Sequence, residues 1–171
     1  MGQFLSKITA QYNPPRKWIM KEDLTYICTE LTEDETQALI QIGVKSLVNV
    51  KNEKEIKVET GFETDLASVP RLCWNIIAPW DVARAAIIHD LLYKRIRQYR
   101  WNGHGNGEDE DTNVNKEEKA LIKLAKKASD NVFLNGMKDA DPKVPKWKIL
   151  TAYYAVVLFG RWSIIPNEDN I

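Results

Sequence analysis

The sequence predicts an α+β protein in which a small N-terminal part rich in β-structure precedes a mainly helical part. Residues 18–60 contain short runs of β-branched and aromatic side chains separated by polar turns, which is typical of strands. After residue 61, apolar side chains recur every three or four positions, which is typical of helices. A polar, glycine-rich segment at residues 102–115 separates two of the helical stretches. These two stretches are therefore predicted to form an antiparallel helix pair.

Length and composition indicate one globular unit. Of the 171 residues, 44% are hydrophobic and 28% are charged, and a chain of this length can bury a substantial core. We therefore predict a single domain at residues 1–171, with an extended arm at residues 1–17, the β-rich part at residues 18–60 and the helical part at residues 61–165. The arm is expected because two consecutive prolines near its end disfavour a helix.

Charge and cysteine content exclude several classes of protein. The 24 basic and 24 acidic side chains cancel, so the total charge gives no reason to expect nucleic acid or an acidic membrane as the main partner. Cys28 and Cys73 are isolated, which argues against a CxxC metal site and a disulfide framework and favours a reducing compartment. Met1–Ala10 lacks the pattern of a signal peptide. The longest apolar stretch, Ile149–Phe159, is too short for a transmembrane segment.

The N-terminal part predicts strands around one short helix. The strands are expected at Trp18–Thr29, Val44–Val50 and Glu55–Thr60. Between them, Thr32–Ile42 is predicted to be helical. Thr32 stands three residues before Glu35, which is the spacing of a capping box, and Gly43 stands where a C-terminal cap would fall.

The C-terminal part predicts four helices. The first is short and begins at Val69-Pro70, where Ser68 can cap it and proline is tolerated in the first turn. The other three are expected at Asp81–Arg100, Glu117–Met137 and Lys146–Phe159. The last of them is strongly apolar, so we expect it to pack into the core.

Two polar constellations are candidates for a site, and the first is the turn GFETDLASVPR at residues 61–71. One interpretation is a buried turn held by an ion pair between Asp65 and Arg71 and by the Ser68 cap. The other interpretation is an active-site loop in which Asp65 offers a carboxylate to a ligand or a metal, supported by Ser68 and Arg71. The sequence leaves both open.

The second constellation is the pair His89-Asp90 within an otherwise apolar helix. Adjacent residues on a helix point about 100° apart, so the two side chains would perform two neighbouring jobs. His89 could act as a base on water, while Asp90 binds a cation that polarises the substrate. Tyr93 lies one turn after His89 on the same face. The alternative is a histidine that is merely a satisfied residue of the core.

Asp130, in the segment ASDNVFL, is the expected partner of His89. The antiparallel helix pair would bring the carboxylate of Asp130 against the imidazole, where it would orient the ring and stabilise its protonated form. The alternative is a helix-surface aspartate beside Lys126 and Lys127.

The motifs together resemble one known family. GFETDLASVPR, a tryptophan, AAIIHDLLY, ASDNVFL and YYAVVLFGRW follow one another between about Val58 and Trp162. This order closely resembles the bacteriophage and prophage domain of unknown function numbered thirteen fifty-three. The resemblance implies a tailed-phage origin, other virion proteins as partners, and a location in the host cytoplasm during synthesis and then in the virion.

A shorter stretch resembles phospholipase A2. The HD and SD helix pair is similar to the helix pair of that enzyme, particularly in its disulfide-poor parvoviral version. The resemblance implies His89 as general base, Asp130 as the carboxylate that orients it, Tyr93 as the supporting tyrosine and Asp90 as a ligand of calcium. Asp65 is the candidate second carboxylate of that calcium site. The upstream loop departs from the pattern, because it has one glycine where those enzymes have a glycine-rich calcium loop.

These observations favour a bacteriophage accessory or virion-associated protein, such as a tail or particle component, with a phospholipase A2-like His–Asp site. Two alternatives stay open. One is a calcium-dependent lipid or ester hydrolase that acts on the host envelope, and the other is a purely structural assembly protein. A metal-dependent phosphoester or peptidoglycan hydrolase is disfavoured. HD phosphohydrolases need a further histidine upstream, whereas His104 lies downstream, and zinc peptidases usually use two or three ligating histidines, which this chain lacks.

Overall fold

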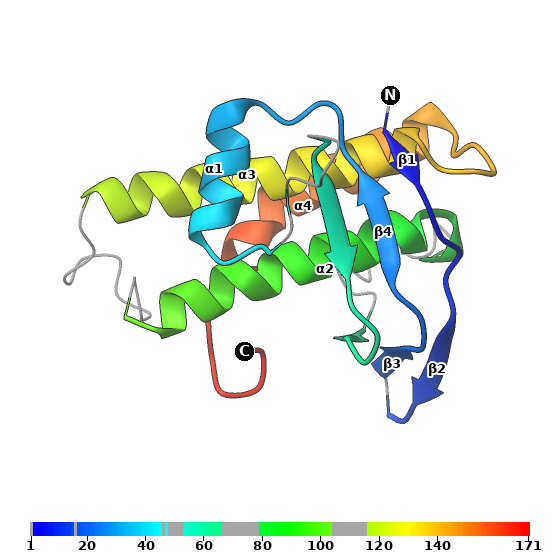
Figure 1. The fold of residues 1–171 in the computed structure, drawn as a ribbon, viewed down its shortest axis with the longest axis horizontal. Helices are drawn as coiled ribbons and strands as arrows, with labels where there is room; N and C mark the ends of the chain where they lie inside the picture. The colour runs from blue at the N-terminus through cyan, green and yellow to red at the C-terminus, as the bar shows by residue number, and fades with distance from the viewer. Residues whose placement is uncertain (1, 16, 46, 48–52, 66–78, 104–115) are drawn as a thin grey trace.

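The computed structural model describes residues 2–15, 17–45, 47, 53–65, 79–103 and 116–171. Small antiparallel sheets from the N-terminal part lie on one side of the long helices from the C-terminal part (Figure 1). The predicted α+β class is confirmed.

In the described part of the chain, short strands form two three-stranded antiparallel sheets. The first sheet has the order β1-β4-β5, made of Gln3–Phe4, Leu24–Ile27 and Glu55–Val58. The second has the order β2-β3-β6, made of Ala10–Asn13, Lys17–Met20 and Glu63–Thr64. The predicted strand Trp18–Thr29 is therefore two strands. The polar run between them turns the chain, and its Asp23 carboxylate accepts hydrogen bonds from the amide and hydroxyl of Thr60.

Two predictions for the N-terminal part need correction. Residues 1–17 are extended as expected, but they are not a separate arm, because β1 pairs with β4 and β2 pairs with β3 of the same chain. The strand predicted at Val44–Val50 is not seen at its described residues Val44, Lys45 and Leu47. The amide of Val44 instead donates to the carbonyl of Leu39 and closes the preceding helix.

Helix α1 (Glu33–Gln41) is bounded as its sequence predicts. The amide of Glu35 donates to the Thr32 hydroxyl at 3.2 Å, and the amide of Thr32 donates to the Glu35 carboxylate at 3.1 Å. Gly43 follows the helix with φ of 91°, a left-handed conformation that glycine adopts without strain. The capping box and the glycine stop are therefore confirmed.

Three long helices carry the C-terminal part. They are α2 (Pro79–Trp101), α3 (Lys116–Lys138) and α4 (Lys146–Ser163), and each extends the corresponding prediction by a few residues. Helices α2 and α3 run antiparallel, since Ala85 lies opposite Gly136 and Tyr93 lies opposite Lys126. The predicted helix pair is confirmed. The short helix predicted at Val69-Pro70 lies outside the described residues.

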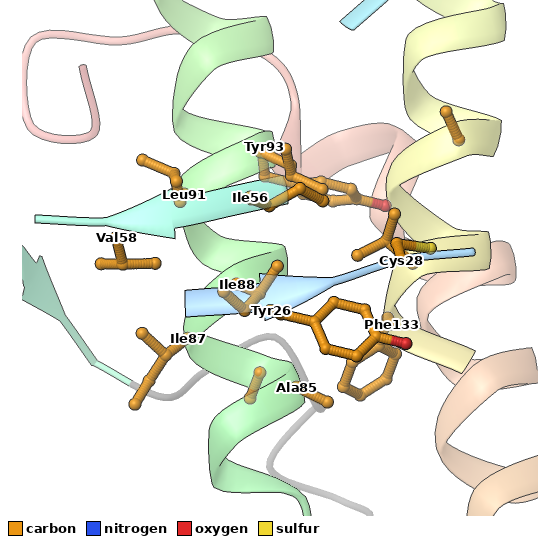
Figure 2. Packing of buried hydrophobic residues seen from close by; sticks show 14 of the residues in the cluster. Tyr26, Cys28, Ile56, Val58, Ala85, Ile87, Ile88, Leu91, Tyr93 and Phe133 are labelled. Carbon is orange, nitrogen blue, oxygen red and sulfur yellow. The ribbon is translucent and has the colours of Figure 1, made fainter. Parts of the chain in front are cut away.

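The core lies between the β1-β4-β5 sheet and the α2–α3 pair. Figure 2 shows Tyr26 and Ile56 of the sheet facing Ile88 of α2 and Phe133 of α3, and all four side chains are fully buried. Alternate residues of β4 point inward, as the two-residue period of a strand requires. This packing holds α2 and α3 together at the level of His89 and Asp130.

Helix α4 forms a further layer behind the α2–α3 pair, on the side away from the β1-β4-β5 sheet (Figure 1). Its inner face is buried, and its outer face is exposed. The prediction that this helix packs into the core is therefore wrong for half of its surface. No helix among the described residues is long and apolar enough to cross a membrane.

Candidate functional site

His89 and Asp130 meet across the interface of α2 and α3. The Nε2 atom of His89 lies 3.2 Å from Oδ1 of Asp130. His89 is 1% exposed and Asp130 is 3% exposed, so water screens their interaction poorly. The antiparallel pairing places a residue in the middle of α2 against one in the middle of α3. The geometry excludes the alternative that Asp130 is a residue of the helix surface.

Two further donors hold the carboxylate of Asp130. The Tyr93 hydroxyl donates to Oδ1 at 2.7 Å, and the Lys126 ammonium donates to Oδ2 at 2.7 Å. Burial would raise the pKa of Asp130, but the hydrogen bond and charge of His89, with the hydrogen bonds of Lys126 and Tyr93, outweigh it and hold that pKa below its ordinary value. Asp130 is therefore a carboxylate at neutral pH.

The ring of His89 is fixed between two aromatic side chains. Its centroid lies 4.0 Å from that of Tyr93 and 5.0 Å from that of Phe133. Nε2 is directed at Asp130, while Nδ1 is buried and has no hydrogen-bond partner among the described residues. Buried polar atoms normally have a partner, so we expect that of Nδ1 to be water, a ligand or a residue outside the described ones.

Tyr93 connects this pair to α4. A Cβ atom on Gly160 would lie 2.2 Å from the Tyr93 hydroxyl, so only glycine lets α4 come this close. Burial, followed by the negative charge of Asp130, raises the pKa of Tyr93 far above its ordinary value. The hydroxyl therefore keeps its proton and donates to Asp130 at all ordinary pH values. Helices α2, α3 and α4 thus meet at one hydroxyl group.

Asp90 points away from this buried pair and into an open pocket of about 640 Å³. Its carboxylate accepts a hydrogen bond from the hydroxyl of Thr64, which lies at the end of β6. Asp65 and Tyr93 line the same pocket, as do Lys94 and Arg97. The side chains of the adjacent residues His89 and Asp90 therefore lie in two different environments, the buried interface of α2 and α3 and the open pocket, as the helical geometry predicts.

The pocket is a poor calcium site as far as it is described. Asp65 and Asp90 both line it, but no group of three or more metal-ligating side chains occurs among the described residues. Calcium prefers six to eight oxygen ligands. Burial lowers the pKa of Arg97, and the charges of Asp90 and Asp65 act against that shift. The positively charged guanidinium of Arg97 thus lies in the same pocket as the two carboxylates and offsets part of their negative charge, as a bound cation would.

Two of the predicted site residues cannot be placed, and two residues that contribute to the site were not predicted. Ser68 and Arg71 lie outside the described residues, and with them the predicted Asp65–Arg71 ion pair. Sequence reasoning missed the contribution of Thr64 and of Gly160. A glycine inside a helix lowers its stability, so Gly160 could have been read as a sign of close packing. No feature of the sequence indicated that Thr64 would contact Asp90.

Comparison with known proteins identifies the family. Residues 42–156 match the family described as "Protein of unknown function (DUF1353)". The chain belongs to this family. The DUF1353 match includes His89, Asp90, Tyr93 and Asp130, which are the site residues of α2 and α3. No curated protein and no solved structure matches the chain, so the resemblance to phospholipase A2 has no support from these comparisons.

Proposed function

We propose that this DUF1353 protein is a hydrolase of ester bonds in which His89 is the general base, and that it serves a bacteriophage as an accessory or virion-associated protein. The observation that supports the chemistry best is the state of the His89 ring. Its Nε2 is held by Asp130, and its buried Nδ1 has no partner among the described residues. A histidine held in this way can take a proton on one nitrogen while the other is stabilised by a carboxylate.

In the proposed reaction Nδ1 takes a proton from a water molecule, and the oxygen of that water attacks the ester carbonyl carbon. The protonated imidazole then returns the proton to the leaving alkoxide as the bond between carbon and the alkoxide oxygen breaks. The products are a carboxylic acid and an alcohol. The proposal requires that a water molecule reaches Nδ1, because His89 is buried and does not line the pocket.

Asp130 acts as a positioning residue in this proposal. Its negative charge stabilises the imidazolium that forms when Nδ1 gains a proton. The donors Tyr93 and Lys126 fix both oxygens of the carboxylate, so the carboxylate cannot rotate without breaking several hydrogen bonds. A rigid, buried arrangement of this kind stabilises developing charge at little cost of reorganisation.

The pocket beside Tyr93 offers a substrate apolar surface and charges of both signs. Phe62 and Phe159 supply apolar surface, and Lys94 and Arg97 supply positive charge beside the carboxylates of Glu63, Asp65, Asp90 and Asp169. We propose a lipid ester of the host envelope as the substrate, because it combines an apolar chain with a charged headgroup. No step of the proposed reaction passes through calcium, because Asp65 and Asp90 supply too few oxygens by themselves.

A second candidate is a purely structural role in a phage particle. It is favoured by the same burial, since Tyr93, Asp130 and Gly160 join three helices around a histidine that is 1% exposed. In this role the network would specify how the helices pack, and His89 would not react.

The experiment compares the wild type with His89→Gln and Lys126→Gln on mixed phospholipid vesicles, with calcium and with a calcium chelator. The glutamine at position 89 can still donate to Asp130 but cannot act as a base. We expect His89→Gln to lose about 100-fold to 10,000-fold of the hydrolytic rate, which is the usual contribution of a general base. Lys126→Gln keeps the histidine and should lose far less.

Each result separates the two candidates. Release of fatty acid by the wild type that His89→Gln abolishes, with both proteins folded by circular dichroism, supports the hydrolase. Equal release from both proteins would sink it. Absence of release from the wild type, together with lower thermal stability of His89→Gln, supports the structural role. A rate that depends on calcium would show that further ligands complete a site around Asp90.

A further inference from the structure

Helix α4 exposes a continuous row of large apolar side chains, here called the outer face of α4. It consists of Trp147, Leu150, Tyr154, Val157, Leu158, Phe159 and Trp162, whose exposed fractions range from 39% to 63%. Trp147, Leu150, Tyr154 and Val157 follow one another at intervals of three or four residues, and Leu158, Phe159 and Trp162 widen the apolar surface toward the end of the helix. Scattered apolar residues are normal on a protein surface, but a continuous row of this size marks an interaction site.

The charged side chains of α4 itself are all positive, whereas the pocket beside Phe159 also contains the carboxylates of Asp90 and Asp169. The helix contains Lys146, Lys148 and Arg161 and no acidic residue. The Lys148 ammonium lies 5.9 Å from the centroid of Trp147, and the Arg161 guanidinium lies 4.0 Å from that of Trp162. Each end of the row therefore combines a tryptophan with a cation. The balanced total charge of the chain conceals this local excess.

This distribution argues against a second copy of the chain as the occupant. In a two-fold symmetric dimer the same surface is used twice, so two antiparallel α4 helices would bring Lys146 and Lys148 of one copy toward Arg161 of the other. Three like charges on each side would repel, and α4 has no carboxylate to offset them. The partner should instead be negatively charged and apolar beneath its charged layer.

We infer that the outer face of α4 docks on the surface of an anionic lipid bilayer. Tryptophan and tyrosine are enriched at the boundary between lipid and water, and lysine and arginine bind anionic headgroups there. In this arrangement the helix lies in the plane of the boundary, with Leu150, Leu158 and Phe159 among the acyl chains. The helix does not cross the bilayer, since its inner face is packed on the protein.

The docking surface is continuous with the pocket. Phe159 belongs to the outer face of α4 and also lines the pocket, together with Gly160 and Ser163 of the same helix. A bilayer bound to α4 would therefore lie beside the pocket that holds Asp90. The inference rests on the surface of α4 alone and stands whether or not His89 is catalytic.

The test is cosedimentation of the full chain with vesicles of ether-linked lipids, which an esterase cannot cleave. One set of vesicles contains phosphatidylglycerol and the other only phosphatidylcholine. We expect binding to the anionic set, and Leu158→Asp should lower it by about tenfold or more, because one leucine is no longer buried. Lys148→Gln should lower it by about fivefold and weaken its dependence on salt. The matched control is Ile40→Asp, an exposed aliphatic residue on α1, which should bind as the wild type does.

Four outcomes decide the matter. Anionic binding that Leu158→Asp removes and Ile40→Asp leaves intact supports the inference. Equal binding by all variants would overturn it, because another surface would then be responsible. A dimer in sedimentation equilibrium that Leu158→Asp dissociates would overturn it in favour of self-association. A monomer that binds neither set of vesicles would overturn it and leave a protein partner as the occupant.

Discussion

The contact between Gly160 and Tyr93 allows a quantitative test of how the three helices are held together. In the interior of an ordinary helix, replacement of glycine by alanine stabilises the protein by about 0.8–1.0 kcal/mol. Here the new methyl group would lie 2.2 Å from the Tyr93 hydroxyl oxygen and 3.1 Å from the carbon that bears it. Since real carbon atoms do not approach an oxygen this closely, the tyrosine or the helix must move.

Movement of the Tyr93 side chain would cost free energy of folding, because it would break contacts with Asp130 and His89. Its hydroxyl donates to Asp130 at 2.7 Å, and its ring packs on His89 with centroids 4.0 Å apart. Overpacking of a core costs about 1–3 kcal/mol, and loss of a hydrogen bond to a charged group costs about 1.5–3 kcal/mol. After subtraction of the gain in helix propensity, Gly160→Ala should destabilise the protein by about 1.5–5 kcal/mol.

The assay is a double-mutant cycle with Tyr93→Phe, followed by urea unfolding. The phenylalanine removes the oxygen that the new methyl group meets first, and by itself it should cost about 1.5–3 kcal/mol through the lost bond to Asp130. In that background the hydrogen bond is already absent, so Gly160→Ala should cost about 1.5–3 kcal/mol less than in the wild type, and this difference is the expected coupling. If Gly160→Ala stabilises the wild type, or if the two effects simply add, the close approach of α4 to Tyr93 is refuted.

Two further predictions concern charge and capping. Because the folded protein holds the pKa of Asp130 below its ordinary value, the carboxylate stabilises the fold fully above about pH 4, the unfolded pKa, and this contribution is lost as the pH falls through the lower folded pKa. The difference in free energy of unfolding between wild type and Asp130→Asn should therefore be larger at pH 6 than at pH 3, and a constant difference would contradict the assignment. Thr32→Ala removes the hydroxyl that accepts the Glu35 amide and should cost about 1 kcal/mol in urea unfolding, whereas Thr29→Ala, at an exposed position before the helix, should cost less than half of that.

The helices and the buried pair were predictable because their signals are local. A capping box needs only Thr32 and Glu35, three residues apart, and α1 begins where they stand. The pairing of His89 with Asp130 needed one additional assumption, that two amphipathic helices joined by a polar segment pack antiparallel. Lys126 follows from the same logic, because it precedes Asp130 by four residues on one helix face.

The strand pairings were not predictable to the same degree. Strands β1 and β6 have two residues each, which is too short for any periodic signal. Their hydrogen bonds join parts of the chain that are distant in sequence, such as Phe4 with Tyr26 and Trp18 with Thr64. The bond from Thr64 to Asp90 depends on such a pairing, so its residues could not be connected before the sheet was known.

Helix α4 was predicted to be buried, but one of its faces is exposed. The sizes of the side chains on its two faces support the docking inference. A helix that belongs to a core usually buries its largest apolar side chains and leaves smaller or polar ones outside. On α4 the order is reversed, since Ala152, Ala155 and Gly160 are buried while Trp147 and Trp162 are exposed. Small inner residues let the helix approach Tyr93 closely, which explains that face. Packing among the described residues leaves the outer tryptophans exposed, and exposing them to water costs about 25 cal/mol for each Å² of apolar surface. Large apolar side chains on a helix are normally buried, and an anionic bilayer against the outer face of α4 would bury those that the protein leaves exposed.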